Sequence, residues 1–290
     1  MTGVLSPVSA AGRHVSLFRR VTAPMRSRWA ILALTILLAG IIAGPAIRHV
    51  DPDALDLGNA AAMPSAAHPF GTDESGRDVL ARLLYGGRVS LSVGLAAVYC
   101  SLLVGVSLGA LAGYRRGAID TVVMRFTDAM LSIPTIFLVI AALTFLGATT
   151  TGLVVAIGAT SWMGIARLVR GEMLSLRERP FIEASRALGA PGRRIVWRHV
   201  LPHVGPSIII SATLGVGTAI LTESALSFLG LGVQPPAASW GNMLSGAQNY
   251  LTSAPRLALY PGAFIVITVV AINVLGDVLR GALDPAGRSV

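Results

Sequence analysis

Long apolar stretches separated by short polar connections dominate the chain from residue 29 to residue 281. A helix needs roughly 20 apolar residues to cross the hydrocarbon core of a bilayer, which is about 30 Å thick. Six stretches meet this requirement, at about residues 29–47, 88–113, 121–146, 150–168, 206–230 and 257–281. The pattern therefore predicts an all-α membrane protein with six transmembrane helices.

The first apolar stretch has the length of a membrane anchor but ends like a signal peptide. Its 19 residues exceed the short apolar core of a cleaved signal. Gly44-Pro45-Ala46 at its end nevertheless resembles a cleavage site. We favour a retained first transmembrane helix over residues 29–47.

The composition agrees with lipid as the solvent of the chain. Hydrophobic residues make up 53% and charged residues 13% of the 290 positions, and the mean hydropathy is +0.70. These values lie outside the range of soluble domains. The net charge is +9, and all 23 basic residues are arginines. Because they gather beside the apolar stretches, they indicate membrane topology and do not support a nucleic-acid partner.

The arginines also orient the chain, since the positive-inside rule assigns the richer side to the cytoplasm. That side holds the leading segment, the connection at Arg115 and Arg116, the tail, and a loop over residues 167–205 with eight arginines. Both termini are therefore predicted to be cytoplasmic. The predicted organisation is a cytoplasmic segment 1–28, a first helix 29–47, an extracytoplasmic segment 48–87, a five-helix core 88–281 and a cytoplasmic tail 282–290. The outward segments 48–87 and 231–256 either cap the bundle or contact a soluble partner.

Glycines recur every four residues in the second predicted span, at Gly105, Gly109 and Gly113. Positions without side chains let helix backbones approach closely, which favours association in lipid. The repeat predicts a tightly packed bundle.

The chain lacks the residue patterns of an enzyme. None of its five histidines lies inside a predicted span, and H-E-x-x-H is absent, which argues against an intramembrane hydrolase or zinc protease. His199 and His203 have no carboxylate or thiol beside them to complete a metal site. A phosphate-binding loop needs a lysine, and the chain has none. We therefore expect no catalytic residue, metal or cofactor in this chain, and another polypeptide must handle any ATP.

Three acidic residues in or near the predicted spans, Asp128, Glu223 and Asp277, need an explanation, because charge inside a membrane is costly. Asp277 lies near the end of the last span, where hydration is the simpler account. Asp128 lies in the third span and Glu223 in the fifth, where Thr222 and Ser224 flank it. Each marks either a translocation path or a hydrogen bond between helices, and for Glu223 we favour the hydrogen bond.

The loop over residues 167–205 predicts two short helices that meet at a glycine elbow. Pro180 ends or starts a helix, Gly189 with Pro191-Gly192 forces a turn, and a second short helix runs to Pro202. On the first helix Ala184, Ala187 and Leu188, together with Phe181, share one face. Alanines at such a contact suit docking into a shaped protein cleft better than binding to a lipid surface.

The loop resembles the cytoplasmic signature of ATP-binding-cassette importer permeases, which is Glu-Ala-Ala, three residues, Gly, nine residues and Ile-x-Leu-Pro. Residues 183–185 and 189 and residues 199–202 match its spacing, although Ser185 replaces an alanine and His199 replaces isoleucine. The histidine is familiar in the peptide-transporter branch. The resemblance implies an ATPase-coupling role for Glu183, Ala184, Ser185, Arg186, Ala187, Leu188, Gly189, His199, Leu201 and Pro202.

Three further segments are similar to the C-type permeases of oligopeptide, dipeptide and nickel importers: residues 68–80 (HPFGTDESGRDVL), 85–91 (YGGRVSL) and 223–232 (ESALSFLGLG). This likeness implies a type I importer permease fold in the bacterial cytoplasmic membrane. It also implies a B-type permease partner, two ATPase subunits that bind ATP and Mg²⁺, and an extracytoplasmic substrate-binding protein. Di- or oligopeptides are the favoured cargo, and the same motifs accompany nickel chelates and other solutes. The alternative function is an ion-coupled secondary transporter that uses Asp128 or Glu223.

Overall fold

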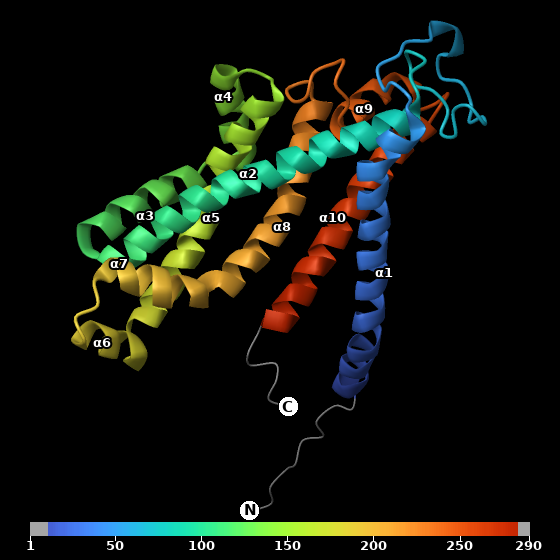
Figure 1. Cartoon of the computed structure of the whole chain (residues 1–290). Coiled ribbons are helices and arrows are strands. Elements are labelled where there is room, and N and C mark those ends of the chain that lie inside the picture. The colour runs from blue at the N-terminus through green and yellow to red at the C-terminus, as the bar shows by residue number, and fades with distance from the viewer. Residues whose placement is uncertain (1–10, 284–290) are drawn as a thin grey trace, which may run out of the picture.

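The computed structural model describes residues 11–283 (Figure 1). The remainder of the predicted cytoplasmic ends, residues 1–10 and 284–290, lies outside this range. Helices dominate the described chain, and its β pairing is a single bridge between Thr72 and Asp78. The α-helices are α1 (Ala11–Arg48), α2 (Val79–Arg115), α3 (Gly117–Leu131), α4 (Thr135–Leu146), α5 (Thr150–Arg177), α6 (Pro180–Ala187), α7 (Gly192–Ile195), α8 (Leu201–Phe228), α9 (Trp240–Gly246) and α10 (Arg256–Leu283). Short turns η1 (Leu57–Asn59) and η3 (Gln248–Tyr250) and a π-helical turn η2 (Val196–Val200) complete the set.

Five segments of the described chain are long and apolar enough to cross a membrane: Ser27–Gly44, Val79–Arg115, Thr150–Arg177, Gly192–Phe228 and Arg256–Leu283. The predicted third span differs from a straight helix, because α3 and α4 meet at a bend of 94°. Pro134 lies at the break and fixes an extended backbone before α4. The count is six when this bent pair is taken as one span.

α2 and α5 pack against each other through the glycine repeat of α2 (Figure 1). A Cβ atom at Gly105 would lie 2.7 Å from the carbonyl oxygen of Trp162, and one at Gly109 would lie 2.5 Å from that of Ala166. Gly113 approaches α5 in the same way. No side chain fits at such distances, so the close packing predicted from the repeat is the contact between α2 and α5.

α1 is tied to α2 by Arg88. Position 45 is a proline, which has no N–H to donate to the carbonyl of Ile41. The Nε atom of Arg88 donates to that carbonyl at 2.9 Å, and Nη2 donates to the carbonyl of Ile42 at 2.6 Å. Arg88 therefore supplies the hydrogen bond that the proline removes.

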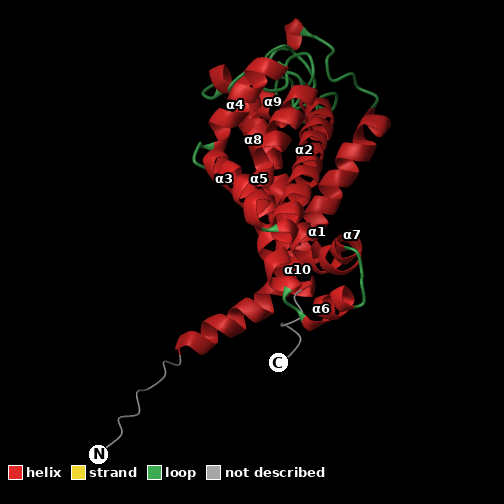
Figure 2. Ribbon diagram, turned by 90° about the vertical axis from the view of Figure 1, so that its left-hand side faces the viewer, coloured by secondary structure: helices red, strands yellow, loops and turns green. Residues whose placement is uncertain are grey.

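The two long outward connections fold together over one end of the bundle, opposite α6 and α7 (Figures 1 and 2). We call residues 49–78 and 229–255 the cap. Arg256, the first residue of α10, ties the first part of the cap to that helix, because its Nη2 donates to the carbonyls of Ala61 and Ala62 at 2.6 and 3.0 Å. Phe70 stacks on Tyr260 with ring centroids 4.6 Å apart. Of the two interpretations left open for the outward segments, capping of the bundle is thus visible in the structure.

The loop between α5 and α8 differs from the prediction at its second helix. α7, η2 and α8 follow one another without interruption, and Pro202 lies in the first turn of α8. A proline is tolerated there because the first N–H groups of a helix have no partner within it. The expectation that Pro202 ends a separate short helix is therefore wrong, and the segment is the beginning of the fifth span.

Candidate functional site

α6 is an eight-residue helix with built-in start and stop signals. Pro180 occupies its first turn, and Glu183 and Arg186 lie near its positive and negative ends respectively, where their charges are favourable. Gly189 follows with a φ of +78°, which suits glycine, and its N–H donates to the carbonyl of Arg186 at 3.0 Å. The predicted glycine elbow is present at this residue.

One large side chain fixes α6 to the bundle. Ile182 is fully buried and packs in a core cluster with Ile195, Val200 and Val204. This cluster connects α6 to η2 and to the first turn of α8. The predicted apolar face of α6 contains Phe181 and leaves out Ile182, because this helix has two apolar faces and only one of them shows as a stripe in the sequence.

The opposite face of α6 is uncovered. Leu188 is 88% exposed, and Ala184 and Ala187 are exposed beside it. Glu183 and Arg186 are also exposed, while Ser185 is half-buried and donates its hydroxyl to the carbonyl of Phe181 at 2.9 Å. A helix that is anchored at Ile182 thus leaves small and apolar residues exposed on its other face.

The last three residues of the predicted coupling set lie away from this face. His199 is in η2, and Leu201 and Pro202 begin α8. The carbonyl oxygen of His199 lies 2.6 Å from Nδ1 of His203, whose ring stacks on Phe181. These residues lie between α6 and α8 and are not part of the exposed face of α6.

Glu223 is fully buried in α8 and accepts hydrogen bonds from three hydroxyls. Ser90 of α2 donates at 2.9 Å, Ser227 at 2.7 Å and Ser224 at 3.3 Å. Ser90 in turn accepts the backbone N–H of Trp240 at 3.3 Å. The carboxylate therefore links α2, α8 and the cap, as the hydrogen-bond interpretation expects.

Asp128 lies on the surface of α3 and pairs with α5. Its carboxylate is 2.5 Å from Nη2 of Arg167, and both side chains are about half exposed. One helical turn further along α5, Arg170 makes two hydrogen bonds to Asp120, at 2.5 and 2.7 Å. The two pairs fasten α3 to α5. Sequence reasoning missed Asp120, although arginines three residues apart on one helix were a signal.

A cavity of about 330 Å³ lies between α2, α5 and α8. Its walls are apolar and carry hydroxyl groups, but no charged side chain lines it. On α8, the hydroxyl-bearing residues Ser211, Thr218 and Thr222 lie on one face together with Gly215. The polar lining consists of Ser101, Ser161, Ser211, Thr218 and Thr222. Neither Glu223 nor Asp128 lines this cavity, so it is a separate candidate for contact with cargo.

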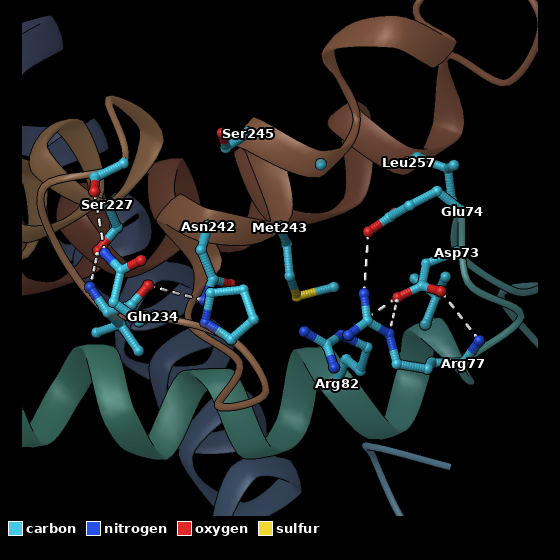
Figure 3. Close-up of a pocket in the computed structure, with 15 residues that line it drawn as sticks. Asp73, Glu74, Arg77, Arg82, Ser227, Gln234, Asn242, Met243, Ser245 and Leu257 are labelled. Atoms are coloured by element: carbon cyan, nitrogen blue, oxygen red, sulfur yellow. Dashed lines mark hydrogen bonds and ion pairs between the residues drawn. The ribbon is translucent and has the colours of Figure 1, made fainter. Parts of the chain in front are cut away.

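A second cavity, of about 260 Å³, lies between the cap and the outer ends of α2 and α8 (Figure 3). Asp73 organises its charged wall: Oδ1 accepts the N–H groups of Ser75 and Arg77, and Oδ2 accepts from Nε of Arg77 at 2.7 Å. Arg82 lies 3.4 Å from the same oxygen and also donates to Asp53 at 3.1 Å. These pairs hold the 68–80 segment to the start of α2.

The charged groups of the bundle do not gather as metal ligands would. Among residues 11–283, no three side chains of His, Cys, Asp or Glu lie together in that way. The only cysteine in the sequence, Cys100, packs at the contact of α2 with α5. A Cβ atom added at Gly158 would lie 2.6 Å from the Cβ atom of Cys100.

Comparison with known proteins shows where this architecture recurs. Residues 105–289 match the protein family described as binding-protein-dependent transport system inner membrane component. The dipeptide transport system permease protein DppC of Alkalihalophilus pseudofirmus is 46% identical over 226 residues, which cover 78% of this chain and 74% of that protein. The oligopeptide transport system permease protein OppC of Escherichia coli K12 is 42% identical over 269 residues, with 91% and 89% covered.

A solved structure has the same fold. The inward-facing MetNI methionine ABC transporter contains a chain that matches with a TM-score of 0.58 and 23% identity. The match covers 70% of this chain and 96% of that one.

Proposed function

The chain belongs to the family of binding-protein-dependent transport system inner membrane components, and on that basis we propose that it forms the translocation path of a peptide importer and couples it to ATP hydrolysis through α6. The predicted C-type ABC importer permease, with its all-α type I fold, is confirmed. The relatives support a permease over the ion-coupled secondary transporter.

The observation that carries the coupling role is the geometry of α6. Ile182 anchors the helix to the beginning of α8, while residues 183–188 leave their small side chains uncovered. A partner that grips this face moves a helix that is packed directly against a membrane span. Rigid-body transmission of this kind is what alternating access requires.

The proposed partners are those that membership of this family implies. Two ATPase subunits bind ATP and Mg²⁺ and receive the α6 face on the cytoplasmic side, where both termini also lie. A B-type permease completes the path, and an extracytoplasmic binding protein delivers cargo to the cap. ATP is assigned to the partner subunits because this chain has no lysine for a phosphate-binding loop.

Peptides are the proposed cargo, because relatives are named for dipeptide, oligopeptide and glutathione transport. The cavity between α2, α5 and α8 suits this class. Its hydroxyls offer hydrogen bonds to peptide groups, and its uncharged walls do not select for a particular side chain.

The coupling role is tested with Ala184→Arg, which places a bulky charge on the exposed face without touching Ile182. We expect at least a tenfold loss of dipeptide uptake and loss of the co-purified ATPase, with normal insertion into the membrane. Ala118→Arg is the matched control, because Ala118 is exposed outside α6. Normal uptake by the Ala184→Arg protein would refute docking at this face.

The path is tested separately at Thr218, an exposed residue that lines the cavity. Thr218→Leu removes the hydroxyl and fills space, so we expect reduced uptake with an undiminished ATPase in the purified complex. Thr218→Ser keeps the hydroxyl and serves as the control. Equal uptake by both variants would remove this cavity from the proposed path.

A further inference from the structure

An apolar groove of about 340 Å³ lies at the end of the bundle that carries α6 and α7. It runs between the last turns of α2 and the segment 192–201. Its apolar walls include Val106, Ala110, Leu111, Tyr114, Val196 and Trp197. We call it the basic-end groove.

Four exposed arginines surround this groove: Arg115, Arg193, Arg194 and Arg198. None of the four forms an ion pair with a residue that the structure describes. Other arginines at this end are paired: Arg116 lies 2.8 Å from Glu178, and Arg170 lies against Asp120. Positive charge around the groove is therefore not compensated by ion pairs with the described residues.

The groove and the arginines form one continuous surface. Arg193 and Trp197 line the groove and also line an adjoining basin, of about 540 Å³, whose other walls are Pro191, Arg194 and Arg198. The surface is apolar along α2 and basic beyond Trp197. This polarity matches an amphipathic anion.

The groove lies at the end of the candidate span Val79–Arg115, and a helix that crosses a membrane reaches the headgroups near its end. α2 ends at Arg115, one turn beyond Leu111, which is 42% exposed. Trp197 is 67% exposed, and exposed tryptophans are enriched at membrane interfaces. Topology alone explains the side on which arginines gather, but it does not explain why unpaired ones border an apolar groove.

We propose that the basic-end groove binds one anionic phospholipid. An acyl chain lies along α2 against Val106 and Leu111, and the phosphate contacts Arg193 and Arg198. Basic pockets between membrane helices bind anionic headgroups through such contacts. The site lies beside the exposed face of α6 without including it, and its occupancy requires only that the chain be in a membrane.

The test uses the full chain, purified with its partner subunits and returned to nanodiscs of phosphatidylcholine with one fifth phosphatidylglycerol. Native mass spectrometry measures the lipid retained after release from the disc. Arg193→Gln with Arg198→Gln is compared with Arg125→Gln with Arg280→Gln, which removes the same charge from exposed positions elsewhere. Ser107→Trp fills the groove and leaves every arginine in place.

We expect retention of phosphatidylglycerol to fall about 30-fold in the first double variant, the factor for about 1 kcal/mol at each of two arginines. The control double variant keeps its lipid, and Ser107→Trp loses it. Equal losses in the two double variants would show an unspecific response to charge and overturn the site. Retention of phosphatidylcholine equal to phosphatidylglycerol would also overturn it. The groove would also have no role if the Ser107→Trp protein retained phosphatidylglycerol and inorganic phosphate displaced it from this variant as readily as from the wild type. The ligand would then be a free anion bound by the arginines.

Discussion

Glu223 offers the sharpest test of how the cap is fastened to the bundle. The hydroxyls of Ser90 and Ser227 donate to its carboxylate and also accept backbone N–H groups, from Trp240 at 3.3 Å and from Val233 at 3.0 Å. Each hydroxyl proton therefore points to the carboxylate. Glu223→Ala removes the acceptor of both protons in a site without exposure to solvent.

The expected loss of stability is estimated from two ranges of free energy for a lost hydrogen bond. A buried donor without a partner costs about 1–3 kcal/mol, whereas hydrogen bonds between membrane helices average about 0.6 and reach about 1.7 kcal/mol. Their overlap gives about 1–2 kcal/mol for each hydroxyl. We expect Glu223→Ala to lower the free energy of unfolding by about 2–4 kcal/mol. Glu223→Gln should lower it by about half as much, because its amide group leaves one hydroxyl proton without an acceptor.

The assay is a double-mutant cycle on chemical unfolding in detergent. Ser90→Ala should destabilise the wild type by about 1 kcal/mol and have almost no effect in the Glu223→Ala protein. Thr213→Ala is the control, because the Thr213 hydroxyl bonds to its own helix at Ile209 and is expected to matter by less than about 0.5 kcal/mol. Additive effects of Ser90→Ala and Glu223→Ala would refute the link between α2 and α8.

Three other changes probe the bundle and the cap. Gly109→Leu should abolish accumulation of folded protein in the membrane, because a Cβ atom there already lies 2.5 Å from the α5 backbone; Gly171→Ala, which meets open space, should accumulate normally. Asp73→Asn breaks buried ion pairs worth about 3 kcal/mol, so limited proteolysis of the cap should accelerate while the helices stay protected. Asp120→Asn should lower stability by about 1–2 kcal/mol, and the exchange of Asp120 with Arg170 should recover part of it; no recovery would show that the pair does not fasten α3 to α5.

The spans were predictable because a membrane helix requires a long apolar stretch, and close helix packing in lipid requires regularly spaced small residues. The glycine repeat of α2 identified a close contact, and Gly189 identified the elbow after α6. Prolines were harder to interpret. Pro134 produces a bend of 94°, whereas Pro202 starts a helix, and the difference depends on which N–H groups the fold leaves unpaired.

Among the site residues, contacts between neighbours in the sequence were predictable and contacts between distant residues were not. Of the polar neighbours that predicted a hydrogen-bonded Glu223, Ser224 donates to the carboxylate at 3.3 Å, whereas Thr222 donates to the carbonyl of Thr218 in its own helix. Ser227, which the prediction did not name, is a closer donor at 2.7 Å. Ser90 stands 133 residues away in the chain, so no local pattern could predict its contact. Ile182 was missed because its burial depends on Ile195 and the turns that follow. The periodicity of apolar residues within one helix does not predict tertiary contacts of this kind.

The contacts of α2 argue against an internal hinge in the upper bundle. Gly105 and Gly109 lock α2 to α5, Gly94 meets Ile220 of α8 so closely that an added Cβ would lie 2.8 Å from it, and Glu223 pins the outer ends of α2 and α8 together. Three spans are therefore fixed to one another by contacts that tolerate no sliding. A displacement of α6 would reach α8 through Ile182 and would then turn all three spans as one body. With the partners of the proposed function, we therefore expect the moving interface of alternating access to lie between this chain and a second permease.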